Sequence, residues 1–193
     1  MCPVRALRVA YTGELGWELH HPIEIQNYLL DILLSAGEEF NLKLVGARAQ
    51  NWLRQEKSYK AFGSDLGRDA GPFESNLSRF VDINKNFLGK DALLKRKTDV
   101  SCVTLLIDGP KDIDPWGREA LYNETEEVML GRLTSAGYSV HFKRSIGIGY
   151  VKSSFSEVGT KLRIKIDDAF WDAEIVQDSP YDPKNERIID RAP

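Results

Sequence analysis

The sequence has few of the residues that build disulfide frameworks or metal centres. Its 193 residues include two cysteines, Cys2 and Cys102, and three histidines. Two cysteines without a CxxC pair cannot make a zinc site by themselves. We therefore expect reduced thiols, in a protein of the cytoplasm or the mitochondrial matrix, and no metal site. The other candidate metal ligands are expected to be solvated side chains, namely His20, His21, Asp178, Asp182 and Asp190.

Long apolar runs, an excess of positive charge and common catalytic motifs are also missing. The longest apolar stretches, at 28–34 and 102–107, fall far short of the roughly 20 residues that span a bilayer. Residues 1–11 show no continuous apolar signal segment. Lys and Arg total 26 against 29 Asp and Glu, so the net charge of −3 gives no general attraction to nucleic acid or to an anionic membrane. We expect neither partner, and no P-loop, HExxH or dinucleotide fingerprint is present.

The hydrophobic pattern changes near Asp99 and predicts two regions of different character. Residues 1–99 mix strands and helices, and residues 100–193 contain short β-type runs. In the first region the apolar residues between 25 and 40 recur with 3.6-residue spacing, which predicts a core-facing helix. The other elements expected there are strands at 4–11 and 77–83, helices at 46–57 and 91–97, and a long loop at 61–76.

The second region predicts a small antiparallel barrel or sandwich. Turns rich in Gly, Asp and Pro separate several short apolar runs, and this spacing is typical of all-β domains. The expected strands are 103–107, 121–122, 128–134, 146–151, 162–166 and 173–176. The fold class is therefore expected to be α+β.

Two segments contain residues suited to binding a flat, polar ring. In YTGELGWE, at 11–18, a glycine turn separates Tyr11 from Glu18, so a hairpin would bring an aromatic face and a carboxylate to one side of a sheet. A heterocycle with adjacent N–H donors could stack on the Tyr11 ring and donate hydrogen bonds to the Glu18 carboxylate. The spacing alone favours an ordinary hairpin with a solvated Glu18. The segment RQEKSYKAFGSD, at 54–65, contains Tyr59, and its pattern alone favours solvated charges with core aromatics.

Taken together, five segments resemble the glycine-cleavage T-protein (aminomethyltransferase) family. They are YTGELGWE, LRQEKSYKAFGSDL, PFESNLSRFVDINKNFLGKDALL, GRLTSAGYSVHFKRSIGIGYV and SPYDPKNERI, in this order, and the resemblance runs from about residue 4 to 188. The ELGWE form and the EKSY stretch look closer to the folate-binding C-terminal region of dimethylglycine and sarcosine dehydrogenases. The resemblance implies the C-terminal part of the T-protein fold. A mixed α/β half-domain at 1–99 would be followed by a β-barrel at 100–193.

The resemblance also implies a site. Tyr11 and Glu18 would line the pterin pocket of a tetrahydrofolate, with Glu18 accepting hydrogen bonds from the pterin amino group and ring N–H. Tyr59 is a further candidate from the segment after the second helix. FAD would be expected only in a domain that precedes this segment, if the parent is a dehydrogenase. The resemblance therefore favours a ligand-binding segment at 11–18 over an ordinary hairpin with a solvated Glu18.

Two departures from the family shape the functional prediction. Gln50 stands where aminomethyltransferases have a folate-contacting arginine, and the family's catalytic aspartate would precede residue 4. We therefore expect no catalytic residue here, and the leading hypothesis is the tetrahydrofolate-binding portion of a dimethylglycine/sarcosine dehydrogenase-like enzyme, incomplete and inactive alone. The alternatives are an aminomethyltransferase proper, or a non-catalytic module that assembles with a partner chain or a missing N-terminal half through an unpaired strand edge near residues 5–11. Whether the chain is itself an enzyme stays open.

Overall fold

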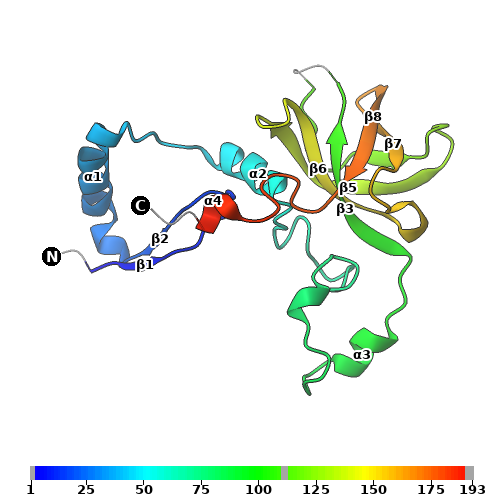
Figure 1. Cartoon of the computed structure of the whole chain (residues 1–193), viewed down its shortest axis with the longest axis horizontal. Helices are drawn as coiled ribbons and strands as arrows, with labels where there is room; N and C mark the ends of the chain where they lie inside the picture. Colours follow the sequence, from blue (N-terminus) through cyan, green and yellow to red (C-terminus); the bar gives the residue numbers. More distant parts are fainter. Residues whose placement is uncertain (1–2, 110–112, 190–193) are drawn as a thin grey trace.

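A closed antiparallel β-barrel contains the hydrophobic core of the protein. The computed structural model describes residues 3–109 and 113–189, and Figure 1 shows the barrel formed by the second half of the chain. Its strands are β3 (Val100–Ile107), β4 (Ala120–Tyr122), β5 (Met129–Ser139), β6 (Arg144–Lys152), β7 (Lys161–Ile166) and β8 (Ala169–Val176). They follow the spatial order β3-β6-β5-β4-β7-β8, and the ring closes because β3 pairs with both β6 and β8. The α+β prediction is confirmed, and each expected strand of the second region lies within or overlaps an observed one.

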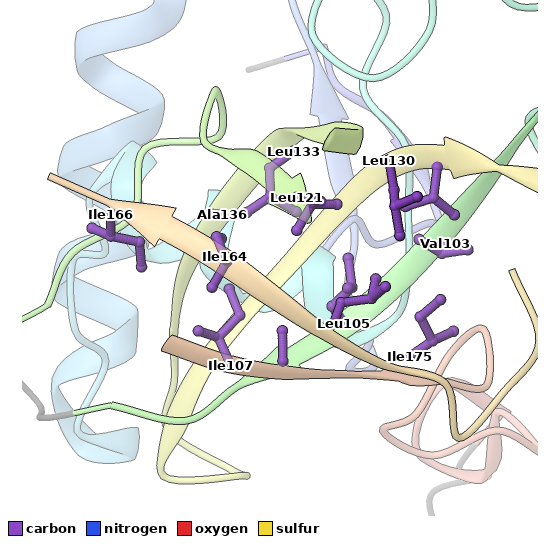
Figure 2. Packing of buried hydrophobic residues seen from close by; sticks show 13 residues of the cluster. Val103, Leu105, Ile107, Leu121, Leu130, Leu133, Ala136, Ile164, Ile166 and Ile175 are labelled. Atoms are coloured by element: carbon purple, nitrogen blue, oxygen red, sulfur yellow. The ribbon is translucent and has the colours of Figure 1, made fainter. Parts of the chain in front are cut away.

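Apolar side chains at alternate positions of the strands fill the barrel interior. On β3, Val103, Leu105 and Ile107 point inward, and Leu105 and Ile107 are fully buried. Figure 2 shows these side chains meeting others from β4, β5, β7 and β8. Each such side chain contributes about 1.5–3 kcal/mol through removal of apolar surface from water. The barrel therefore has its own core, which does not depend on the first half of the chain.

The first region is more open. It begins with the two-stranded sheet of β1 (Arg5–Leu7) and β2 (Glu18–His20) and continues through α1 (Gln26–Gly37) and α2 (Ala47–Glu56) to α3 (Lys90–Lys95). Its short 3-10 turns are η1 (Ile23–Ile25), η2 (Glu38–Phe40) and η3 (Ser78–Phe80). In the second region, a further 3-10 turn, η4 (Ser153–Phe155), lies between β6 and β7, and helix α4 (Glu186–Ile189) follows the barrel. Among the described residues, no helix is long and apolar enough to cross a membrane.

One predicted strand of the first region is wrong. The segment 77–83 contains the 3-10 turn η3 (Ser78–Phe80) and no strand, because its backbone hydrogen bonds close locally. The Phe80 amide donates to the Leu77 carbonyl at 3.0 Å, and the Val81 amide donates to the Ser78 carbonyl at 3.0 Å. Among the described residues, no strand pairs with this segment.

The helix predicted between 25 and 40 is present, but its expected core-facing packing is not. Only Gly37 is buried in α1, and Tyr28, Ile32 and Leu33, which share the predicted apolar face, are 58%, 42% and 38% exposed. In Figure 1 the helix lies at the opposite end of the molecule from the barrel. The 3.6-residue spacing thus identified the helix correctly, whereas no described element covers its apolar face.

The second helix joins the first region to the barrel. The indole of Trp52 on α2 lies against Gly137 on β5 so closely that a Cβ there would be 2.0 Å from Trp52 Cδ1. The ring of Tyr138 meets the same indole edge-on, with 6.5 Å between centroids. Gly137 is therefore required for the close approach of the helix, and α2 is held where its C-terminal residues reach the barrel wall.

Candidate ligand-binding site

The segment that ends α2 is charged and buried. Arg54, Gln55, Glu56 and Lys57 are each at most 4% exposed. The Arg54 guanidinium donates to Asp65 Oδ2 at 2.6 Å, the Tyr59 carbonyl at 2.7 Å and Ser135 Oγ at 2.7 Å. The pattern-based prediction of solvated charges in this segment is therefore wrong. A charged run next to a barrel strand can be buried when every donor finds an acceptor.

Asp65 is the second centre of this network. Its Oδ2 accepts the Ala61 amide at 2.9 Å in addition to Arg54, and its Oδ1 accepts the Thr134 hydroxyl at 2.5 Å. The Tyr150 hydroxyl donates to the Asp65 carbonyl at 2.9 Å. Burial raises the pKa of Tyr150 to about 12, because the phenolate loses its hydration. Helix α2, the loop after it and strands β5 and β6 are thereby linked through polar groups.

Two lysines connect this segment to the residues after β8. Lys57 Nζ donates to the Asp182 carbonyl at 2.5 Å and to Asn185 Oδ1 at 2.8 Å. Lys60 Nζ lies 3.2 Å from Asp178 Oδ2. The expectation of a solvated side chain is therefore wrong for Asp182, which is 10% exposed, whereas the Asp178 side chain is 40% exposed although it pairs with Lys60. Asp190 lies outside the described residues.

Two of the predicted site residues meet at one cavity. The rings of Tyr11 and Tyr59 stack with centroids 6.0 Å apart and planes 18° apart. Both line a cavity of about 450 Å³, together with Lys57, Lys60 and Arg79. Burial raises the pKa of both phenols, so both stay neutral at physiological pH. The Arg54 guanidinium lies 6.0 Å from the centroid of the Tyr11 ring.

Glu18, the third predicted site residue, lies elsewhere on the same hairpin. It is exposed on β2, pairs with His20 at 3.4 Å, and is not among the cavity's lining residues. Its role in binding stays a prediction. The residues that sequence reasoning missed are Arg54, Asp65 and Arg79, and no local pattern distinguishes them from solvated charges.

The described part of the chain offers no competing metal centre. Among residues 3–109 and 113–189, no group of three or more His, Cys, Asp and Glu side chains could hold a metal ion. Cys102 is free and buried, and burial raises its pKa to about 12, which makes the thiol unreactive. Cys2 lies outside the described residues. A second hollow of about 360 Å³ on the barrel surface is charged, but its Arg163 already pairs with Glu126 and Asp172.

Comparison with known families identifies the fold. The model of the GCVT N-terminal domain matches residues 1–85, and that of the glycine cleavage T-protein C-terminal barrel domain matches residues 101–182. The chain belongs to the glycine-cleavage T-protein family. The resemblance seen in the five sequence segments is thereby confirmed. The boundary near Asp99 between the two predicted regions stays a prediction.

Curated relatives come from both branches of this family. Mitochondrial dimethylglycine dehydrogenase of Mus musculus is 38% identical over 183 residues, which cover 91% of this chain and 20% of that protein. Aminomethyltransferase of Caldanaerobacter subterraneus subsp. tengcongensis is 31% identical over 175 residues, which cover 90% of this chain and 46% of that protein. The aminomethyltransferase T structure from Bartonella henselae matches with a TM-score of 0.80 at 23% identity, covering 92% of this chain and 50% of that one. The chain therefore spans about a fifth of the first relative and about half of the others.

Proposed function

We propose that this chain is the tetrahydrofolate-binding portion of a folate-dependent one-carbon enzyme of the dimethylglycine dehydrogenase type. The observation that carries the proposal is the stacked pair of Tyr11 and Tyr59 at the wall of a 450 Å³ cavity. Neutral aromatic faces favour a flat heterocycle such as a pterin. The family match supports a folate as the source of that ring.

The polar end of the ligand would meet specific side chains. Glu18 is carried by the hairpin that also holds Tyr11, and we assign it the pterin N–H donors, because an ionised carboxylate accepts paired hydrogen bonds. Lys57 and Lys60 are already engaged by Asp182 and Asp178. Arg79 is therefore the cavity cation left for the carboxylates of a folate, since within the described ranges its guanidinium forms no ion pair.

The chemical step is assigned to residues outside this chain. Gln50 lies on α2 where the aminomethyltransferase branch would have a folate-contacting arginine, and this supports the dehydrogenase branch. FAD would be bound by another domain of such a parent. We propose that the chain alone binds a reduced folate but does not turn over, in the cytoplasm or the mitochondrial matrix. An aminomethyltransferase proper is the alternative activity.

Calorimetric titration with tetrahydrofolate tests this proposal. Tyr11→Ala, Tyr59→Ala and Glu18→Gln should each weaken binding by about tenfold or more, because each removes a ring face or a charge-assisted acceptor. Tyr28→Ala and Glu24→Gln, at exposed positions near or on α1, are matched controls and should bind like the wild-type chain. Wild-type affinity in all three site variants, or no binding by the wild-type chain, would contradict the proposal.

A second candidate function is assembly with a partner polypeptide, and the uncovered apolar surface of the first region favours it. On α1, Tyr28, Ile32 and Leu33 lie on one side of the helix and are 58%, 42% and 38% exposed, and on the hairpin Trp17 is 58% exposed. Contiguous exposed apolar side chains mark interaction surfaces. Sedimentation of the wild-type chain and of Ile32→Glu, alone and with the separately expressed remainder of a T-protein N-terminal domain, tests it. If the wild-type chain and Ile32→Glu both sediment as monomers alone, and neither forms a complex with the N-terminal remainder, assembly is excluded.

A further inference from the structure

The residues after β8 return across the molecule instead of ending at the barrel. Residues 178–185, which we name the strap, run from the barrel past α2 to α4, which lies beside the β1–β2 hairpin (Figure 1). Asp178, Ser179, Pro183 and Asn185 of the strap line the Tyr11–Tyr59 cavity. The strap thus forms one wall of the proposed ligand site.

The strap contains no helix or strand. Its own hydrogen bonds lie at its C-terminal end, where the Asn185 amide donates to the Asp182 carbonyl and the Asp182 carboxylate accepts the Glu186 and Arg187 amides. Ser179, Asp182 and Asn185 have φ angles of 57°, 45° and 59°, a backbone region that L-residues other than glycine adopt at a cost. Three such residues within seven positions require contacts from the rest of the protein to hold them. Two of those contacts are hydrogen bonds from strap amides. The Ser179 amide donates to Ser58 Oγ at 2.8 Å, and the Tyr181 amide donates to the Glu56 carbonyl at 3.0 Å.

Lys57 lies where three segments meet. Its side chain is fully buried, and its ammonium donates to the Asp182 carbonyl and to Asn185 Oδ1. Its methylene stem lies under the hairpin turn, where a Cβ on Gly13 would be 2.4 Å from Lys57 Cγ. Beside it, the Tyr181 hydroxyl donates to Glu14 of the same turn. A buried ammonium is costly unless its donors are satisfied, and the strap supplies those acceptors.

We infer that Lys57 is a positioning residue whose ammonium clamps the strap in place as a wall of the Tyr11–Tyr59 cavity. Lys57 and the strap stabilise one another, because the strap acceptors keep the ammonium paired and the ammonium fixes the strained backbone. The effect of the clamp on ligand binding rests on the proposed function. The hydrogen bonds between Lys57 and the strap do not depend on a ligand, so the clamp and the proposed function can fail separately.

Amide hydrogen exchange of the full chain tests the clamp without any ligand. In Lys57→Met, which keeps the stem and removes the donors, the Ser179 and Tyr181 amides should exchange at least tenfold faster. The Leu105 amide in the barrel core should keep its wild-type rate, which separates local release from global destabilisation. Lys184→Met, at an exposed strap position, is the matched control and should leave all three rates unchanged.

A second variant covers the case in which Lys57→Met does not fold. Asn185→Gly removes one strap acceptor at a φ of 59°, which glycine adopts without strain, and should release the same two amides. Wild-type exchange at Ser179 and Tyr181 in Lys57→Met, or in Asn185→Gly where the first is unfolded, would overturn the clamp. Equal acceleration in Lys184→Met would overturn it as well.

Tetrahydrofolate binding tests the consequence for the cavity. In Lys57→Met the ligand should dissociate about tenfold faster, because one wall of its site is released. An unchanged dissociation rate alongside released amides would overturn the role of the strap as a wall. If neither protein binds tetrahydrofolate, the proposed function fails, and the exchange rates alone decide whether Lys57 clamps the strap.

Discussion

Removal of the Arg54 guanidinium should be among the most destabilising single changes in the first region. Arg54→Met deletes charge-assisted hydrogen bonds to Asp65, Ser135, Tyr59 and Asn51, all between 2.6 and 2.8 Å. The side chains of the Arg54–Asp65 pair are 3% and 0% exposed, so water cannot replace the lost partner. Breaking a buried pair by removing one member costs about 3–5 kcal/mol. That is a large share of the 5–15 kcal/mol that stabilises a typical domain.

Urea unfolding followed by tryptophan fluorescence and circular dichroism measures this cost. Arg163→Met provides the matched control, because Arg163 also pairs with two carboxylates but at the barrel surface, where its side chain is 25% exposed. Surface pairs contribute at most about 1 kcal/mol. Because Arg163 makes two such pairs, the Arg54→Met chain should lose at least about 1 kcal/mol more than the Arg163→Met chain.

A double substitution tests the reasoning itself. In Arg54→Met/Asp65→Asn the uncompensated carboxylate charge is also removed, so the combined loss should fall short of the sum of the single losses by about 1–3 kcal/mol. Equal losses for Arg54→Met and Arg163→Met would refute the claim that burial makes this pair important. Strict additivity in the double variant would refute the claim that an unpaired charge causes the loss.

Three further predictions concern the barrel and its contact with the first region. The Tyr150 phenol has its pKa raised by burial from 10 to about 12, so the folded chain keeps a proton that the unfolded chain loses, and stability should fall as pH rises from 10 to 12. Tyr150→Phe should flatten that decline in urea midpoints while costing about 1 kcal/mol at pH 7 for the lost hydrogen bond. Gly137→Ala should destabilise the wild-type chain by about 1–3 kcal/mol but cost much less in a Trp52→Ala background, because its Cβ meets the Trp52 indole. Leu133→Ala should cost about 2–5 kcal/mol in the same assay, whereas Leu33→Ala on the uncovered face of α1 should cost less than about 1 kcal/mol.

Regular elements were predictable where a local hydrophobic period matches a local structure. The alternation of Leu162, Ile164 and Ile166 with charged residues indicates a strand with one buried face, and the spacing around Tyr28 and Ile32 indicates a helix. The prediction failed at 77–83, where no described strand pairs with the segment and the backbone closes local hydrogen bonds. A strand depends on its partners in a way that a helix does not.

The candidate site was only partly predictable for a similar reason. Motif resemblance singled out Tyr11 and Tyr59, which lie 48 positions apart in the chain and stack in the fold. Nothing in the local pattern distinguishes Arg54 and Lys57 from solvated charges, because their acceptors Ser135 and Asp182 come from distant parts of the chain.

By itself, the sequence determined the family, the α+β class and the barrel strands, because ordered motifs and period-two alternation are local properties. The tertiary structure alone decided which charges are buried, how the strap returns to the hairpin, and that the apolar face of α1 stays uncovered within the described chain. Burial and pairing depend on which distant segments meet. The sequence shows which side chains can donate or accept hydrogen bonds, but not which of them lie within hydrogen-bond distance in the folded protein.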